Sequence, residues 1–305
     1  MGPTASGKTS LAIELVNKYP FEIISVDSAL IYKDMAIGTA KPTDKELALA
    51  PHHLINFLDP TLSYSVADFR SDALSKIKEI HGRNKIPLLV GGTVLYHRAL
   101  LYGLSELPSS DPKIRDRLNL LLTEKGPNFL HQKLAEIDPV SANKIHPNDP
   151  QRIQRALEVY EITAKPLSVL QQQSKSKAID YPVSKIVIAP TTRELLRERI
   201  AIRFHQMIKE GFITEVKQLY NRGDLSLDIP SMRSIGYRQV WQYLDQQISY
   251  DEMIDTGITA TRQFAKRQMT WLKKEQDALW LETGGENNLE LVTKKLMQHD
   301  YFESN

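Results

Sequence analysis

The sequence predicts an α/β protein, in which a parallel sheet core carries helices on both faces and an all-helical insertion interrupts the chain. Helical and strand-like apolar patterns alternate along the first third of the sequence, which is the rhythm of a parallel sheet with crossover helices. A middle region bounded by breaker residues shows helical patterns only. A glycine-rich phosphate-binding motif opens the chain, and in such folds this motif joins a buried strand to a helix.

The core elements follow from the spacing of apolar residues. This spacing predicts helices over residues 7–18 and 94–102, and Ser65 followed by Asp68 marks the start of another that runs to Ile80. Strands are expected at residues 21–27, 86–90, 185–189 and 278–281, further helices over most of 193–274, and a peripheral tail from Gly284.

Residues 108–182 form the predicted insertion. The breaker run LPSSDP at 107–112 leads into it, and the polar run QQQSKSK at 171–177 leads out. Asp149 and Pro150 are suited to the N-cap and first position of one of its helices. We therefore expect two domains: a catalytic core with a basic helical C-terminal part, from residues 1–107 and 183–305, and a helical insertion domain.

Composition narrows the class of protein. The chain has 305 residues, of which 41% are hydrophobic and 25% charged, as in ordinary globular proteins. Its longest apolar runs are far too short to cross a bilayer, and it contains no cysteine, which excludes disulfides and thiolate chemistry. A cytoplasmic protein is the default expectation, and a monomer is the simplest one.

The motif at residues 2–9 predicts phosphate binding. It matches G-x-x-x-x-G-K-[ST] at every fixed position, with Gly2, Gly7, Lys8 and Thr9. Backbone N–H groups of such a loop surround phosphate oxygens, the lysine reaches an outer phosphate, and the threonine hydroxyl ligates Mg²⁺. The full loop, expected to bind a diphosphate or nucleotide, comprises Gly2, Pro3, Thr4, Ala5, Ser6, Gly7, Lys8 and Thr9.

The motif lacks the apolar strand that normally precedes it. Only Met1 stands before Gly2 in the printed sequence. We therefore expect the first strand of the sheet to be missing from the N-terminus, and our hypothesis is that Met1 is an internal methionine of a longer protein.

Two polar residues end neighbouring strands at the edge where open α/β sheets bind ligands. Asp27 follows one apolar run and Thr93 follows another. A carboxylate beside a phosphate site is suited to hold a metal or to act as a general base. The alternative for Asp27 is a structural cap at the end of a strand.

Basic and aromatic residues combine near the C-terminal end. Five Lys or Arg residues and no acid lie between Arg262 and Lys274, together with Phe264 and Trp271. A run of this kind by itself more often forms a solvated helix face. Similar combinations recur in SMRSIGYRQVW at 231–241 and around the paired arginines of DPQRIQRALEVY at 149–160, and they favour RNA over a small kinase substrate.

At these residues the chain resembles the bacterial tRNA dimethylallyltransferases. The matching segments occur in order from residue 2 to residue 274: GPTASGKT, SVDSALIY, IGTAKP, LLVGGT, HPNDPQRIQRALEVY, RFHQM, IGYRQ and TRQFAKRQMTW. The resemblance implies transfer of a dimethylallyl group from dimethylallyl diphosphate to N6 of adenosine 37, in the anticodon stem-loop of tRNA, with Mg²⁺. The phosphate-binding loop then holds the diphosphate of an isoprenoid donor.

The resemblance also assigns roles to individual residues. It makes Asp27 the general base, with Lys8, Thr9 and Arg203 as the other catalytic residues and Thr9 as the metal ligand; the alternative for Arg203 is an ion pair with Glu198 or Glu210. The residues that it implies in tRNA binding are Asp27, Ser28, Ala29, Leu30, Thr93, Arg115, Gln151, Arg152, Ile153, Gln154, Arg155, Arg233, Ser234, Ile235, Gly236, Tyr237, Arg238, Lys266, Arg267, Gln268, Met269, Thr270, Trp271, Leu272 and Lys273.

Two other functions remain open from the sequence. One is an adenylate isopentenyltransferase that prenylates free nucleotides, for which competition between AMP and tRNA is the discriminating observation. The other is an ATP-dependent RNA-binding protein without prenyl transfer, which tight ATP binding with phosphate release would favour. The helical insertion and the basic segment at 266–273 favour tRNA as the acceptor.

Overall fold

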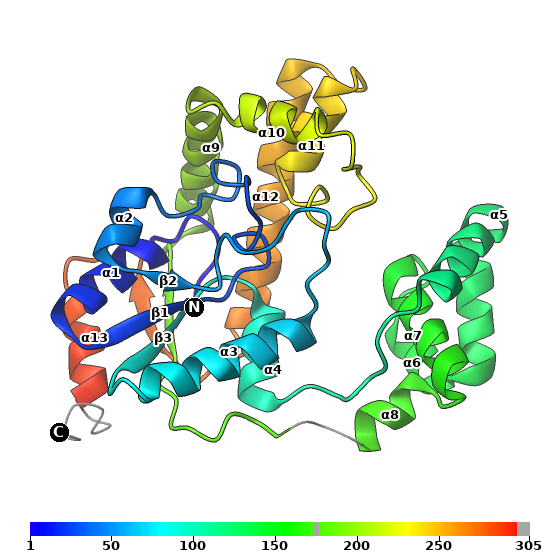
Figure 1. The fold of residues 1–305 in the computed structure, drawn as a ribbon, viewed down its shortest axis with the longest axis horizontal. Helices are drawn as coiled ribbons and strands as arrows, with labels where there is room; N and C mark the ends of the chain where they lie inside the picture. Colours follow the sequence, from blue (N-terminus) through cyan, green and yellow to red (C-terminus); the bar gives the residue numbers. More distant parts are fainter. Residues whose placement is uncertain (174–176, 298–305) are drawn as a thin grey trace. The chain divides into compact units, whose positions relative to one another are not determined.

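The computed structural model describes residues 1–173 and 177–297, which form two compact units (Figure 1). The first, here called the core unit, comprises residues 1–97 and 181–305, and the second, the helical unit, comprises residues 98–180. The polar exit linker expected at 171–177 lies partly outside the described residues. Each unit has a hydrophobic core of its own.

The core unit contains two small parallel sheets. In the first, β1 (Phe21–Ser25) lies between β2 (His52–His53) and β3 (Ile86–Val90), and in the second β4 (Ile186–Ala189) pairs with β5 (Leu279–Glu282). The four strands expected from the sequence are confirmed, to within two residues at each end. The expectation of a single sheet is wrong, because β3 and β4 are edge strands of separate sheets.

Met1 provides a short stretch of pairing along β4. Its terminal amine donates a hydrogen bond to the Ile186 carbonyl (2.8 Å), and its carbonyl accepts one from the Ile188 N–H (3.0 Å). The side chains of β3 and β4 also share one apolar cluster, which includes Leu88 and Ile188. The strand expected before Gly2 lies outside the printed sequence and stays a prediction.

Helices near the sheets begin where the sequence predicts. The expected helix 7–18 is α1 (Lys8–Lys18), and α3 (Val66–His81) starts at the capping box formed by Ser65 and Asp68. Both helices pack against β1 and β3. The remaining helices of this part of the chain are α2 (Asp44–Leu49) and α4 (Val94–Tyr102).

A cluster of helices from the C-terminal third of the chain forms the other part of the core unit (Figure 1). These are α9 (Arg193–Lys209), α10 (Phe212–Tyr220), α11 (Tyr237–Leu244) and α12 (Tyr250–Leu272). Their inner side chains, among them Phe212, Tyr237 and Met253, are fully buried and pack against Ile31 and Met35 from the loop after β1. The helices therefore pack against the loop that follows β1, in which Asp27 lies.

The C-terminal segment is not the peripheral tail that its polar sequence suggested. Helix α13 (Asn288–Met297) packs against α1 and β5. Val292 is completely buried there and Leu296 nearly so. Two apolar residues four positions apart are enough to anchor one face of a short helix, although the surrounding polar residues hide this pattern.

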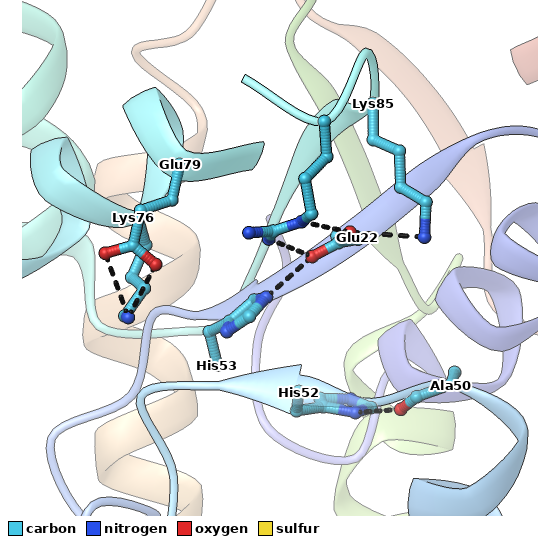
Figure 2. A network of polar contacts seen from close by, with 8 residues as sticks. Glu22, Ala50, His52, His53, Lys76, Glu79 and Lys85 are labelled. Atoms are coloured by element: carbon cyan, nitrogen blue, oxygen red, sulfur yellow. Dashed lines mark hydrogen bonds and ion pairs between the residues drawn. The ribbon is translucent and has the colours of Figure 1, made fainter. Parts of the chain in front are cut away.

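One carboxylate ties the strands together near their amino ends (Figure 2). Glu22 of β1 accepts a bidentate hydrogen bond from Arg83 (3.1 and 2.7 Å), a third from His53 of β2 (2.8 Å), and forms an ion pair with Lys85 (3.2 Å). The hydrogen bonds from Arg83, His53 and Lys85, Arg83 foremost, lower the pKa of Glu22 to about 2 against the opposing effect of burial. Strand β2 itself was not predicted, because two residues carry no periodicity.

The helical unit is built from α5 (Pro112–Ile137), α6 (Pro139–Lys144), α7 (Pro150–Thr163) and α8 (Leu167–Gln173). A glycine with φ of 76° at Gly126, followed by a proline, bends α5. Leu130, Leu134 and Ile153 are completely buried in the core of this unit. Within the residues that the structure describes, no helix of either unit is long and apolar enough to cross a membrane.

Candidate active site

The phosphate-binding loop leads directly into α1. Gly7, with φ of 87°, is the N-cap, and Lys8 begins the helix. The Lys8 ammonium donates a hydrogen bond to the Pro3 carbonyl (2.6 Å), so the lysine folds back across its own loop. Thr9 follows in the first turn of α1. This arrangement supplies free backbone N–H groups and the positive end of a helix to an anion.

Side chains of α9 and α12 hold the loop from outside. The Arg203 guanidinium donates to the Thr4 hydroxyl, and Arg199 donates to the Ala5 carbonyl (2.9 Å). Gln268 of α12 accepts a hydrogen bond from the Thr4 N–H (2.9 Å). The ion pairs of Arg203 with Glu198 or Glu210 that the sequence left open are replaced by this contact with the loop. Sequence reasoning missed the contact of Arg199 altogether.

The basic groups of the site are partly desolvated. Burial lowers the pKa of Lys8 to about 8, with Asp27 opposing the shift and Arg203 adding to it. Burial also lowers the pKa of Arg203, against the attraction of Asp27. Lys8, Asp27 and Arg203 therefore interact electrostatically, and the two cations outnumber the one carboxylate, which favours an anionic ligand.

Asp27 and Thr93 meet at the carboxyl ends of β1 and β3. One Asp27 carboxylate oxygen accepts hydrogen bonds from the N–H groups of Ala29 (2.9 Å) and Leu30 (3.3 Å), which fixes the side chain. The Thr93 hydroxyl accepts one from the Ser28 N–H (3.1 Å). A Cβ at Gly91 would lie 2.0 Å from the Val26 carbonyl, so glycine is required where the two strand ends approach.

A cavity of about 340 Å³ opens between these strand ends and the helices. Thr4, Asp27, Thr93 and Arg203 supply its polar wall, and apolar side chains from α9, α10 and α12 face them. The apolar lining comprises Ile200, Phe204, Met207, Phe212, Ile235 and Phe264. A site with one charged end and one apolar wall is suited to a ligand with a charged head and a hydrocarbon tail.

The turn at residues 36–38 forms part of this cavity and has an unexpected anchor. The Glu215 carboxylate accepts hydrogen bonds from three consecutive N–H groups, those of Ala36 (2.9 Å), Ile37 (2.7 Å) and Gly38 (3.1 Å), and from the Tyr237 hydroxyl (2.6 Å). A Cβ at Gly38 would lie 2.0 Å from the Phe212 ring. Glu215 lies within a stretch that carried no motif in the sequence.

The segment at 233–238 divides between the cavity and the surface. The cavity is lined by Arg233, Ser234, Ile235, Gly236 and Tyr237, whereas Arg238 is exposed. Tyr237 is completely buried. Its hydroxyl donates a hydrogen bond to Glu215, and its expected contact with tRNA stays a prediction.

Helix α12 has one inner and one outer face. Lys266, Arg267, Thr270, Trp271 and Lys273 are exposed, while Met269 is partly buried. Gln268 and Leu272 are buried, so their side chains face the interior of the core unit, and their expected contact with tRNA stays a prediction. The burial of these residues follows the helical period, because Ala265, Gln268 and Leu272 lie on one face of the helix. Phe264 lines the cavity, and Lys274 lies over the Trp271 ring.

In the helical unit, two of the predicted arginines converge on one acid. Arg115 (3.0 Å) and Arg155 (2.6 Å) both donate to Glu158, which is 1% exposed, and Arg155 also donates to the Pro108 carbonyl. Burial raises the pKa of Glu158, but the two arginines outweigh it and the net shift is downward. Arg152 is exposed and paired with Asp149, whereas Ile153 is completely buried in the core of the helical unit.

The remaining predicted residues of this unit lie on the outward part of α7. Gln151 is exposed, and Gln154 is partly buried and donates to Asn119 (2.8 Å). The residues that the structure describes contain no group of three or more His, Cys, Asp or Glu arranged to hold a metal ion.

Comparison with known proteins gives consistent matches over the whole chain. The IPP transferase family model matches residues 30–275. The chain is 36% identical to the full-length tRNA isopentenylpyrophosphate transferase of Bacillus halodurans, covering 100% of this chain and 97% of that one with a TM-score of 0.70. It is also 36% identical to the tRNA delta(2)-isopentenylpyrophosphate transferase of Staphylococcus epidermidis, over 98% of both chains with a TM-score of 0.69.

A third solved structure is a eukaryotic dimethylallyltransferase acting on tRNA. It is 28% identical, covers 100% of this chain and 78% of that chain, and has a TM-score of 0.82. Since the family model spans most of the chain and two relatives exceed one-third identity over nearly all of it, this chain belongs to the IPP transferase family.

Proposed function

We propose that this protein is a tRNA dimethylallyltransferase, which moves a dimethylallyl group from dimethylallyl diphosphate to N6 of adenosine 37 in the anticodon loop. The observation that carries the proposal is the two-sided cavity, where Arg203 and the phosphate-binding loop meet Asp27 and an apolar wall. Membership of the IPP transferase family and the tRNA-acting relatives support the same reaction.

The donor's two ends match the two sides of the cavity. Its diphosphate is held by backbone N–H groups of residues 5–9 and by Lys8, and its five-carbon chain lies against Phe204, Met207 and Phe264. The allylic C–O bond breaks and diphosphate leaves. Lys8 and Arg203 stabilise the negative charge that develops on the leaving oxygen, because both are already desolvated beside the loop.

Mg²⁺ suits this set of donors. The Thr9 hydroxyl in the first turn of α1 is its protein ligand, and diphosphate oxygens and water supply the others, in keeping with the preference of Mg²⁺ for few protein ligands. The ion neutralises part of the diphosphate charge when it is bound.

Asp27 is the general base. As the bond between N6 and the allylic carbon forms, the amine loses a proton to the carboxylate oxygen that is not held by Ala29 and Leu30. Ser28, Ala29, Leu30 and Thr93 surround the adenine at the strand ends. The base must leave its stack to reach them, so it is flipped out of the anticodon loop.

The surfaces that bind the rest of the tRNA lie on both units. The outer face of α12 and Arg238 contact the phosphate backbone in the core unit. In the helical unit, Arg115, Gln151, Arg152, Gln154 and Arg155 contact the anticodon loop, and Glu158 orients Arg115 and Arg155 for this role. The helical unit is thus the anticodon-reading domain.

Prenyl transfer tests the proposal directly. The protein is incubated with Mg²⁺, labelled dimethylallyl diphosphate and an anticodon stem-loop that contains adenosine 37. We expect label on that nucleotide and none on a matched stem-loop with guanosine 37. Absence of transfer to any tRNA substrate would overturn the enzyme assignment, whereas transfer to a different adenosine would overturn only the position. Transfer to free AMP with competition by tRNA would favour the nucleotide-modifying alternative.

The base assignment has its own test in Asp27→Asn. Asparagine retains the oxygen that accepts from Ala29 and Leu30, so the strand end stays folded and only the proton acceptor is lost. We expect kcat to fall by roughly 10²–10⁴-fold, with tRNA affinity within about threefold of the parent. Equal losses in kcat and affinity would contradict the assignment.

A further inference from the structure

Gln268 links the two halves of the cavity from inside α12. Its Oε1 accepts a hydrogen bond from the Thr4 N–H (2.9 Å) and its Nε2 donates one to the Gly92 carbonyl (2.7 Å). The side chain is 4% exposed. One neighbour is a donor and the other an acceptor, so both ends of the amide are satisfied in this one orientation only.

The two hydrogen-bond partners of Gln268 lie in the proposed binding sites of two different substrates. Thr4 lies in the loop that holds the diphosphate, and it also contacts Arg203. Gly92 immediately precedes Thr93, whose hydroxyl holds the Ser28 N–H beside Asp27. The amide of Gln268 therefore spans from the donor-binding loop to the strand ends where the adenine is proposed to bind.

The local sequence is adapted to this contact. A Cβ at Gly92 would lie 2.4 Å from Nε2 of Gln268 and 3.2 Å from the Gly2 carbonyl. Any side chain at position 92 would push the amide away, because a real Cβ does not approach another atom so closely. The glycine at 92 and the glutamine at 268 are thus two parts of one contact.

We propose that Gln268 is a positioning residue, which sets the separation between the allylic carbon of the donor and the N6 amine of the acceptor. The inference rests on the proposed function. It assigns Gln268 to the interior of the reaction site rather than to the tRNA surface of α12. Because misplacement by about 1 Å can cost about 10²-fold in rate, the effect falls on turnover more than on binding.

The first test compares Gln268→Met with Gln218→Met. Both replace a glutamine within a helix of the core unit, but Gln218 is exposed on α10 and serves as the matched control. Methionine fills the volume of glutamine without making either hydrogen bond. We expect Gln268→Met to lower kcat by about 10- to 100-fold with KM for dimethylallyl diphosphate and for tRNA within about threefold, and Gln218→Met to leave all three unchanged. Unchanged kcat in Gln268→Met, with active parent protein, overturns the inference and leaves the proposed function standing.

The second test uses Gln268→Glu and the pH dependence of kcat. A protonated glutamic acid reproduces both hydrogen bonds, whereas its carboxylate repels the Gly92 carbonyl. Burial beside that carbonyl favours the neutral form. The rate of this variant relative to the parent should therefore rise as the pH falls from about 8.5 to 5.5. A constant ratio over this range contradicts a role through these hydrogen bonds.

The third test separates positioning from loss of stability. Gly92→Ala should lower kcat as Gln268→Met does, and the double variant should be no slower than the slower single variant, because both remove the same contact. Thermal unfolding must show every variant folded at the assay temperature. Losses that multiply in the double variant would mean that the two residues act separately and would refute the inference. If the parent protein transfers no prenyl group at all, the proposed function fails first and this inference fails with it.

Discussion

Single residues in the phosphate-binding loop are held in unfavourable states until an anion arrives. Lys8 is desolvated and donates to the Pro3 carbonyl, and its pKa is lowered to about 8. Ala5 has φ of 62°, in the left-handed region where a Cβ is strained. Arg199 donates a hydrogen bond to the carbonyl of Ala5, and Gln268 accepts one from the N–H of the preceding residue, Thr4. The conformation of the loop therefore depends on contacts with neighbouring helices, and changing these contacts should alter binding to the loop.

The pKa of Lys8 predicts how donor affinity depends on pH. Below about pH 8 the lysine is charged and ready for the diphosphate, whereas above it the empty site holds the neutral amine. Binding at higher pH must take up a proton, so affinity should fall by about tenfold per pH unit between pH 8.5 and 9.5.

Calorimetric titration with dimethylallyl diphosphate at fixed Mg²⁺ measures this slope, and the heat in buffers of different ionisation enthalpy measures the proton uptake. The diphosphate itself has no proton left to lose in this range. Affinity that stays constant from pH 7 to 9.5 would show that Lys8 remains charged in the empty site.

Arg199 and Ala5 predict a coupled effect on the donor. The guanidinium of Arg199 holds the Ala5 carbonyl, which stabilises the strained backbone at that residue. Arg199→Ala should raise KM for dimethylallyl diphosphate by about tenfold, as expected for loss of one charge-assisted hydrogen bond. In an Ala5→Gly background the same change should cost less than about threefold, because glycine adopts this φ without strain.

The matched control is Arg197→Ala, which replaces an exposed arginine on the same helix and should leave KM for dimethylallyl diphosphate unchanged. If the penalty of Arg199→Ala is the same in both backgrounds, Arg199 acts on the substrate and not through the backbone of Ala5. The steady-state measurement of KM in the four variants decides between these two roles.

At the scale of elements, α12 serves two purposes with its two faces. Ala265, Gln268 and Leu272 face inward against the loop and the core, while Lys266, Arg267 and Lys273 are exposed. Both faces occur within two turns of helix. The sequence run of basic residues therefore belongs to a helix whose other side supports the site, which distinguishes it from a merely solvated surface.

The exposed face of α12 predicts the salt dependence of tRNA binding. Each of Lys266→Ala and Arg267→Ala should weaken binding and flatten the slope of log K against log[salt] by about 0.7–0.9, as for loss of one phosphate contact. Lys18→Ala, at an exposed position on α1, is the control and should change neither. Filter binding between 50 and about 300 mM salt measures the slope. A variant that binds less well at an unchanged slope would place that residue away from the phosphates.

At the scale of the whole molecule, the described residues of each unit have buried apolar clusters of their own. The core unit is assembled from residues far apart in the sequence, while the helical unit is one continuous stretch, with its buried side chains contributed by α5 to α8. Leu130, Leu134 and Ile153 are completely buried within it. A continuous segment with its own core has what is needed to fold alone.

A fragment of residues 106–173 tests this expectation. We expect helical circular dichroism and cooperative thermal unfolding, and we expect Leu130→Ala to destabilise the fragment by about 2–5 kcal/mol because it leaves a cavity in this core. Glu161→Ala, which removes the surface ion pair with Arg117, is the control and should cost less than about 1 kcal/mol. An unfolded fragment would mean that these helices depend on the rest of the chain.

The sequence predicted phosphate binding by residues 2–9 and an insertion domain, and both stay predictions. It determined by itself the four longer strands and most helix starts. These follow from glycine spacing, apolar periodicity and capping residues, which act over a few positions. The resemblance to the tRNA dimethylallyltransferases also came from the sequence, since its segments are long and ordered.

Only the tertiary structure decided what those elements touch. Four contacts join residues far apart in the chain. Glu215 binds the turn at 36–38, and Arg199 binds Ala5. Gln268 joins Thr4 to Gly92, and α13 packs on α1. Local patterns cannot predict such pairs, because a glutamine on a helix looks the same whether its amide meets water or a buried N–H group. Burial decides between these environments, and burial depends on the whole fold.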